Sequence, residues 1–190
     1  MFMTIDDFKS HVRNVARPNR FIVQVLPSPF VWKSASLSLS SIIDAVRFVS
    51  TNPINLTFMC KGAQIPGRSI GVVEHKRNGV THKFGGDSSH EDLTLTFLAD
   101  ESWAGRVLFE NWMEQIANNR ENTRGYVQDY TMGSKIIVMQ MGANNLPICI
   151  YNFENVFPHT ISTIDLNSES SDQLAEFTVS LQYSYWDRVA

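Results

Sequence analysis

Apolar and polar residues alternate in several stretches of this chain, and the clearest case lies near its C-terminal end. From Phe177 to Tyr185 every second residue is apolar or aromatic, and the residues between carry a hydroxyl or an amide but no charge: Thr178, Ser180, Gln182 and Ser184. A period of two predicts a strand with one buried and one wet face. An uncharged wet face suits a surface that meets water without holding charged molecules.

Other extended runs predict strands over residues 20–26, 54–61, 68–74, 80–84, 91–98, 134–141, 146–156 and 160–166. Asn78-Gly79 lies between two of these runs and is a strong signal for a tight hairpin turn. Asn144-Asn145 predicts a second hairpin. We expect residues 62–67 to form a turn and residues 85–89, which begin Gly-Gly-Asp, to form a flexible loop.

Three segments follow helical spacing instead. A main helix, capped by Asp100 or Ser102, is predicted to run to about Asn118, with one apolar side made by Trp103, Val107, Leu108, Trp112 and Ile116. A short helix is predicted from Thr4 to just before Arg17-Pro18, with Ile5, Phe8, Val12 and Val15 on one side. Within an insertion at residues 27–53, a helical stripe is formed by Leu39, Ile42, Ile43, Val46 and Val49.

Together these elements predict an α+β fold in a single domain, residues 1–190. The strands on both sides of one main helix favour a mostly antiparallel rolled β-sheet or β-barrel closed by that helix. A chain of 190 residues is long enough for one full core.

Composition and charge limit the classes of function that we expect. With a formal net charge of −3, the chain has no overall excess of basic residues of the kind that nucleic-acid-binding proteins show. The N-terminus does not read as a secretory signal, and no apolar run reaches the length of a membrane helix. We expect Cys60 and Cys149 to be buried free thiols, although a disulfide between them stays open.

The residues that could carry chemistry are few and badly spaced. His75, His82 and His90 lie near Asp87, but their spacing fits no compact zinc motif. There is no nucleophile elbow, and the Gly-Gly-Asp segment lacks the remainder of a phosphate loop. We expect no catalytic residue, no metal and no cofactor. A small metalloenzyme that uses His75, Asp87 and His90 is the competing hypothesis from another functional class.

Six segments, in this order, resemble the tail tube proteins of contractile-tailed bacteriophages. Residues 16–23 read ARPNRFIV, residues 56–66 read LTFMCKGAQIP, and FGGD at 84–87 precedes DLTLT at 92–96. LADE at 98–101 precedes FENW at 109–112, NVFP occupies 155–158, and FTVSL at 177–181 precedes YW at 185–186. The insertion at 27–53 departs from the tube pattern. The related baseplate tube initiator proteins also carry an insertion after the first strand.

The resemblance implies a structural virion protein, assembled in the host cytoplasm and located in the tail. Six copies would form a ring, and rings would stack into a tube inside a sheath, with baseplate or terminator proteins at its ends. Double-stranded DNA would pass through the channel without specific contacts. The resemblance also implies that polar loops order on an adjacent subunit, and the candidates are Arg77, Asn78, Phe84 and Asp87. Channel-lining candidates are Thr94, Thr96, Thr178, Ser180 and Gln182.

Two alternatives within this class stay open. An initiator or adapter ring at the baseplate end would use the insertion at 27–53 to hold partners. A tube subunit of a cellular contractile injection system would share the general fold. The sequence does not decide between these places.

Overall fold

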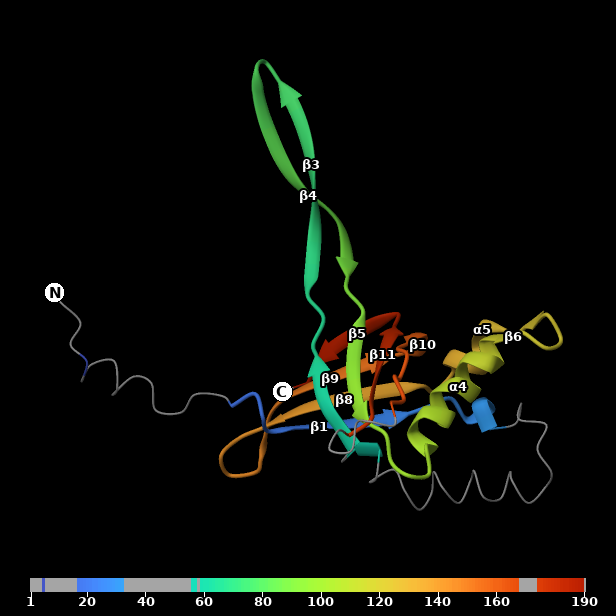
Figure 1. Cartoon of the computed structure of the whole chain (residues 1–190). Coiled ribbons are helices and arrows are strands. Elements are labelled where there is room, and N and C mark those ends of the chain that lie inside the picture. Colours follow the sequence, from blue (N-terminus) through green and yellow to red (C-terminus); the bar gives the residue numbers. More distant parts are fainter. Residues whose placement is uncertain (1–4, 6–16, 33–55, 58, 168–173, 190) are drawn as a thin grey trace.

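Two four-stranded antiparallel sheets form the body of the molecule, and a long two-stranded hairpin projects from it (Figure 1). The computed structural model describes Ile5 and residues 17–32, 56–57, 59–167 and 174–189. The first sheet has the order β1-β8-β9-β12, formed by Phe21–Leu26, Lys135–Met141, Pro147–Glu154 and Tyr185–Arg188. The second has the order β10-β11-β5-β2, formed by Phe157–Ile161, Glu176–Gln182, Leu93–Leu98 and Cys60–Gln64.

Alternation along the strands builds the core between the two sheets. The inward residues are almost fully buried: Val23 and Val25 on β1, Ile136 and Val138 on β8, Phe153 on β9, Leu93, Leu95 and Phe97 on β5, and Phe177, Val179 and Leu181 on β11. The residues between them on β5 and β11 are only half-buried. The period of two in the sequence therefore separates a core face from an outer face.

The main helix α4, Ala104–Ile116, adds its own apolar side to this core. The Phe109 ring lies 5.4 Å from Phe97 and 6.4 Å from Phe177 between ring centroids. Trp112 is fully buried, and its Nε1 donates to the backbone carbonyl of Tyr130 at 2.9 Å. That hydrogen bond joins α4 to the short helix α5, Val127–Thr131. The 3-10 helix η1, Pro29–Trp32, contacts both α4 and α5. The small strands β6, Ala117–Asn118, and β7, Thr123–Arg124, pair after α4.

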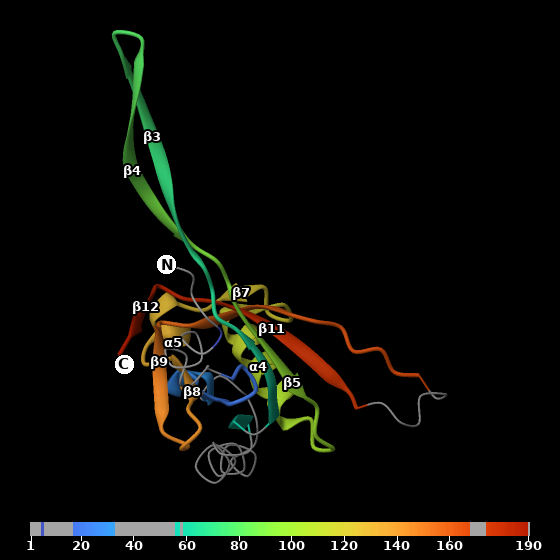
Figure 2. The same cartoon turned by 90° about the vertical axis from the view of Figure 1, so that its left-hand side faces the viewer.

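The projecting hairpin consists of β3, Arg68–Arg77, and β4, Val80–His90. Figures 1 and 2 show it leaving the body where β2 ends and β5 begins. Its turn is the predicted Asn78-Gly79, with φ of 52° and 80° respectively, which is the left-handed backbone that such two-residue turns need. The predicted Asn144-Asn145 turn also forms, and Asn145 has a φ of 57°.

Several predictions on strand and loop boundaries were wrong. Residues 85–89 are not a flexible loop but part of β4, because a bulge pairs Ile70 with Ser88 and Val72 with Gly85. A Cβ on Gly86 would lie 3.1 Å from Val73 Cγ2, so glycine here permits close approach between strands. The strand predicted at 54–61 instead covers Cys60–Gln64, where β5 supplies the hydrogen-bonding partner.

The predicted final strand is two strands in different sheets. β11 ends at Gln182 and pairs with β5, whereas β12 begins at Tyr185 and pairs with β9. Likewise the strand expected at 160–166 runs over Phe157–Ile161, because Asn155, with a φ of 53°, ends the preceding strand.

Neither predicted side chain caps α4. The N-cap is Trp103 with a φ of 55°, and the Ser102 hydroxyl donates to the Asp100 carboxylate instead.

The described strands form two open sheets rather than one closed barrel, so the rolled-sheet prediction holds only in its coarser form, a mostly antiparallel α+β fold. Within the described residues, β1 and β12 are the edges of one sheet, and β10 and β2 are the edges of the other. The predicted N-terminal helix, apart from Ile5, and the helix of the insertion lie outside the described residues.

Candidate functional site

The five channel-lining candidates gather on one surface, the outer face of the second sheet. β5 and β11 pair in register, so Thr96 lies opposite Thr178 and Thr94 lies opposite Ser180. The hydroxyl oxygens of Thr96 and Thr178 are 3.2 Å apart and share a hydrogen bond. We call the surface formed by Thr94, Thr96, Thr178, Ser180 and Gln182 the hydroxyl face.

Neighbouring strands widen the hydroxyl face without adding charge to its centre. Gly62 of β2 pairs with Thr96, and Gln64 pairs with Thr94. On the other side, Thr160 of β10 pairs with Ser180. The centre of the surface across all four strands is thus built from hydroxyls, amides and a glycine, while Phe157 of β10 pairs with Gln182 at one end.

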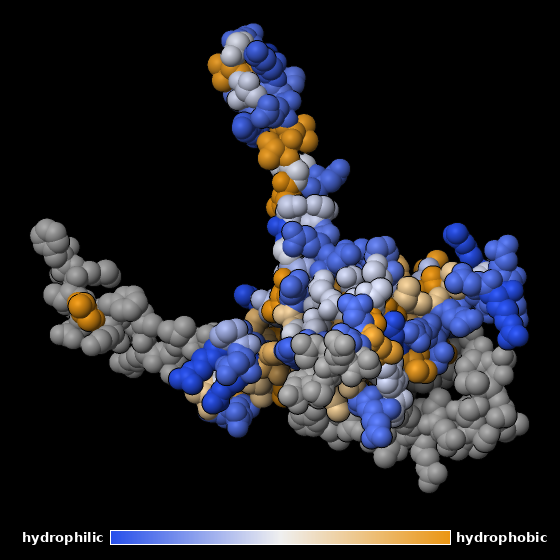
Figure 3. Space-filling model, viewed as in Figure 1, coloured by the Kyte–Doolittle hydropathy of each residue, from blue (hydrophilic) through white to orange (hydrophobic). Residues whose placement is uncertain are grey.

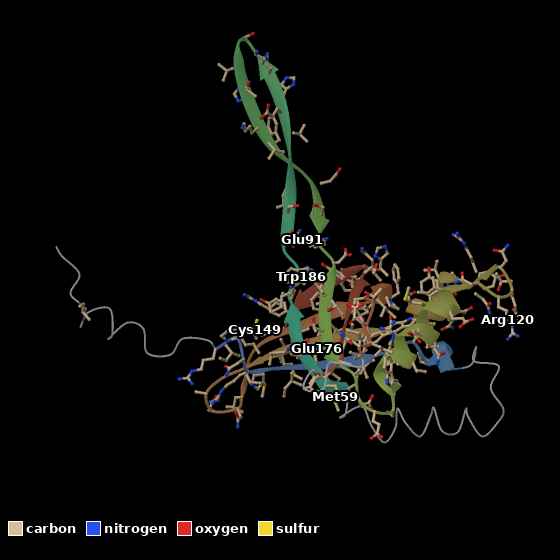
Figure 4. All side chains as sticks on the ribbon, in the orientation of Figure 1. Met59, Glu91, Arg120, Cys149, Glu176 and Trp186 are labelled. Atoms are coloured by element: carbon tan, nitrogen blue, oxygen red, sulfur yellow. The ribbon has the colours of Figure 1, made fainter. Side chains whose placement is uncertain are left out.

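Charges flank this surface at its two ends and are already engaged there. At one end, Gln182 Nε2 donates to Asp92 Oδ1 at 2.6 Å. At the other end, Lys61 forms an ion pair with Glu176, the residue labelled in Figure 4. The centre of the face is therefore left neutral, with weak hydrogen-bonding groups that water can satisfy.

The inter-subunit candidates all lie on the projecting hairpin but are spread along it. Arg77 and Asn78 are at the tip, Phe84 is in the middle of β4, and Asp87 is near the base. Nine residues separate Asn78 from Asp87, which at about 3.3 Å per residue is about 30 Å. They form a long arm rather than one compact site.

The hairpin exposes apolar side chains, whereas the sequence interpretation treated it as polar. Val73 and Phe84 are cross-strand partners and are 55% and 58% exposed, and Ile70, Val72 and Val80 are exposed as well. In Figure 3 hydrophobic surface alternates with hydrophilic surface along the whole projection. Apolar residues on both faces of one strand, such as adjacent Val72 and Val73, were the available signal, because a strand that covers a core has only one such face.

A hairpin of this kind is only marginally stable by itself. An isolated two-stranded ribbon in water lacks a core, and the ion pair between Lys83 and Glu74, 3.3 Å apart, is exposed and contributes little. At the base, the Glu91 N–H donates to the Gly67 carbonyl at 3.3 Å. The arm is thus anchored to the body only at its base.

The geometry does not bring the histidine candidates of the enzyme hypothesis together. His90 pairs with Arg68, while His75 pairs with His82, seven residues further along β3. That separation is about 23 Å at 3.3 Å per residue. Across the part of the chain that the structure describes, no three His, Cys, Asp or Glu side chains are arranged to hold a metal ion.

Both cysteines are free, half-buried thiols. Burial raises the pKa of the Cys60 thiol to about 12, against a smaller lowering by its hydrogen bond to the Gly62 carbonyl. A thiol that stays protonated at neutral pH is a poor nucleophile. Burial, followed by the nearby Asp92 and Glu91, likewise raises the pKa of Tyr183.

Comparison with known proteins gives these surfaces a context. The family described as phage tail tube protein matches residues 16–189, which is nearly the whole chain. The chain belongs to this family. Tail tube protein gp19 of Enterobacteria phage T4 is 26% identical over 139 residues, covering 70% of this chain and 82% of gp19. Its counterpart from Enterobacteria phage T6 is 27% identical over the same lengths.

Solved structures show the same fold at low identity. A chain of the sheath-tube complex of an extracellular contractile injection system (PVC) in the extended state aligns with a TM-score of 0.60 and 14% identity, covering 100% of this chain and 99% of that one. A chain of the anti-feeding prophage baseplate aligns with a TM-score of 0.59 and 14% identity, covering 93% and 97%.

As a tail tube family member, the chain is a structural component of a virion tail and not an enzyme. This confirms the resemblance that the six sequence segments carried. In the described part of the chain, no helix combines the length and apolar character needed to cross a membrane.

Proposed function

We propose that six copies of this tail tube family member form a ring, and that rings stack into the tube of a contractile tail through which DNA leaves the capsid. The observation that supports this most is the second sheet, because it has a neutral outer face and each of its edge strands, β10 and β2, pairs with one strand only among the described residues. Free edges favour pairing with another chain, and a closed ring would pair every edge.

In this proposal the hydroxyl face lines the channel. DNA carries one negative charge per about 1.7 Å of its axis and binds strongly to clustered Lys and Arg. A wall of Thr, Ser and Gln gives no such attraction, and the one lysine beside it, Lys61, is paired with Glu176. The wall would let DNA slide without being held.

The hairpin β3-β4 is proposed to reach an adjacent subunit. Its Val73 and Phe84 are more than half exposed, and burial of apolar area is the main favourable term in association. Contact with a neighbour would both stabilise the ribbon and join the copies. Arg77, Asn78 and Asp87 would then make polar contacts at the tip and the base.

We favour the repeating tube over an initiator ring, because both sequence relatives are named tail tube proteins. Quantitative mass spectrometry of intact virions tests this choice. A repeating tube requires many times six copies per tail, whereas about six copies would identify an adapter ring.

Electron microscopy of the purified protein, with and without a nucleating baseplate, tests the assembly. We expect six-fold rings that stack into tubes of uniform width. A protein that stays monomeric at high concentration beside a baseplate would refute the proposal.

A charge placed on the hydroxyl face tests its position. Ser180→Lys should fold and assemble, because Ser180 points away from the core, but DNA delivery should fall since every ring would carry six added positive charges. Thr123→Lys, at an exposed site on β7, is the control for net charge. If the two variants deliver DNA equally well in an infectivity assay, the hydroxyl face does not line the channel.

A further inference from the structure

The first sheet carries an apolar row on its outer face that is only partly buried. Ile22 of β1 pairs with Met139 of β8, and Met139 pairs with Ile150 of β9. The Val189 N–H then donates to the Ile150 carbonyl at 2.9 Å, which continues the row past the end of β12. We call Ile22, Met139, Ile150 and Val189 the apolar row.

Burial shows that this row differs from the inner face of the same strands. Val23 and Phe153, which point inward, have no exposed surface, whereas Val189 is 62% exposed and Ile22, Met139 and Ile150 are partly exposed. Ile148, one position along β9 on the same face, is 54% exposed. An exposed apolar surface of this kind is a candidate interaction site.

The outer face is apolar across all four strands only at one end, because the rows beyond it mix polar or charged residues with Ile137, Leu26 and Tyr185. The next row consists of Gln24, Ile137, Asn152 and Asp187, and the row after it contains Lys135 and Glu154, whose charged groups lie 2.6 Å apart. The apolar row therefore lies at the end of the sheet where β1 begins. This is also where the N-terminal segment of the chain joins the body.

That junction is held in place by specific contacts. A turn closes as the Arg20 N–H donates to the Arg17 carbonyl at 3.3 Å. The Arg20 guanidinium donates to the carbonyls of Gly142 and Ala143 at 3.2 and 3.1 Å, in the turn between β8 and β9. The chain thus leaves the body close to Ile22.

The sequence before this turn has the character of a partner for the row. Ile5, Phe8, Val12 and Val15 follow helical spacing and would form one apolar side. Thirteen residues, 4–16, would make a helix about 20 Å long at 1.5 Å per residue. Four strands spaced at about 4.8 Å span about 14 Å, so such a helix could cover the whole row.

Ile5 is 74% exposed, and the apolar row is only partly buried, so both could lose exposed apolar area on contact. We propose that residues 4–16 of one copy dock as an amphipathic helix on the apolar row of a second copy. Two different surfaces of the same chain would meet, which is a heterologous contact that can continue from copy to copy. The inference rests on the proposed self-assembly but names a contact separate from the hydroxyl face and the hairpin.

Residues 33–55, which include most of the insertion at 27–53, are a less suitable occupant. The two ends of this segment are anchored at Val31 and Leu56, both buried. A Cβ on Gly105 of α4 would lie 3.0 Å from Leu56 Cδ1, and η1 contacts α4 and α5, so both ends lie on the helix side of the core. They leave the body away from the end of the sheet where β1 begins.

Crosslinking between two populations of the full-length chain tests the proposal. With Cys60→Ala and Cys149→Ala as background, one population carries Val12→Cys and the other carries Met139→Cys, and a short bismaleimide joins nearby thiols. We expect a covalent dimer in the mixture. The control replaces Met139→Cys with Tyr185→Cys, which is exposed on the same face but two rows away, and should give at least about tenfold less dimer because a helix is only about 10–12 Å wide.

Further variants make the outcomes decisive. Adding Phe8→Glu to the Val12→Cys chain should abolish the crosslinked dimer, while adding Ile43→Glu in the insertion should leave it unchanged. The reverse result would show that the insertion occupies the apolar row and would overturn the inference. A crosslink that forms only within single chains carrying both cysteines would also overturn it. If electron microscopy shows rings but no crosslinked dimer forms, the proposed docking is wrong and the proposed tube is unaffected. If the crosslinked dimer forms but no rings are seen, the proposed tube is wrong.

Discussion

The exposed hairpin gives the most direct prediction about assembly. Replacing Val73 and Phe84 together by Thr removes a cross-strand apolar pair but places β-branched residues suited to a strand at both positions. Neither residue belongs to the core. We therefore expect the isolated monomer to melt within about 1 °C of the parent chain. A loss of about 1 kcal/mol in stability would lower Tm by about 2–4 °C, so the measurement would detect it.

The effect on assembly should be much larger. Complete burial of a Val or Phe side chain stabilises by about 1.5–3 kcal/mol. Because 55% and 58% of these two side chains are exposed in the monomer, contact with a neighbour can bury about half of that area. The double variant then loses about 2 kcal/mol per contact, which corresponds to roughly a 30-fold higher critical concentration for tube formation.

Sedimentation of polymerised protein over a concentration series measures this threshold. Ser69→Thr with Ser89→Thr is the matched control, because it alters another cross-strand pair of the same hairpin without removing apolar surface. An unchanged threshold in the Val73 and Phe84 variant would show that this face of the hairpin contacts no neighbour. A marked fall in the monomer's Tm would show instead that the hairpin packs on its own body.

Three further predictions concern the folded body. Gly125→Ala should lower the free energy of unfolding by about 1–3 kcal/mol in urea denaturation, because its Cβ would lie 2.3 Å from the Gln115 carbonyl oxygen; Gly85→Ala, with nothing nearer than 3.9 Å, should change it little. Trp112→Phe should cost about 1 kcal/mol or more by the same measurement, since a buried hydrogen bond to α5 is lost. Cys60 should resist iodoacetamide at pH 8, and stability should fall as pH rises from 9 toward 12, because the unfolded thiol ionises while the folded one keeps its proton; rapid labelling of the native protein at pH 8 would contradict the raised pKa.

The local pattern was enough to find most strands and their outward residues. Thr94 and Ser180 are far apart in the chain, yet each alternates with residues that reach the core, so each could be assigned to a wet face from sequence. The Asn78-Gly79 turn could also be predicted from the sequence, because two successive positive φ angles require residues of this kind. The ordered segments that resemble tail tube proteins predicted the family.

The pairing of strands in space could not be predicted from the local sequence pattern. Alternation continues through Tyr183 and Tyr185, but the strand changes sheet between them, because hydrogen bonding to β5 ends at Leu181 and bonding to β9 begins at Tyr185. The choice of partner strand depends on residues distant in the sequence, which a local period does not encode. The glycines at 85 and 86 misled for the same reason, since only the opposite strand reveals a bulge rather than a loop.

The sequence by itself therefore determined which side chains turn away from the core, since a strand's pleat has a fixed period of two. Only the tertiary structure decided that Thr96 and Thr178 touch across one neutral face and that His75 and His90 lie far apart. Register between strands is set by the packing of two sheets around a shared core. Surfaces built from several strands exist only once that packing is in place.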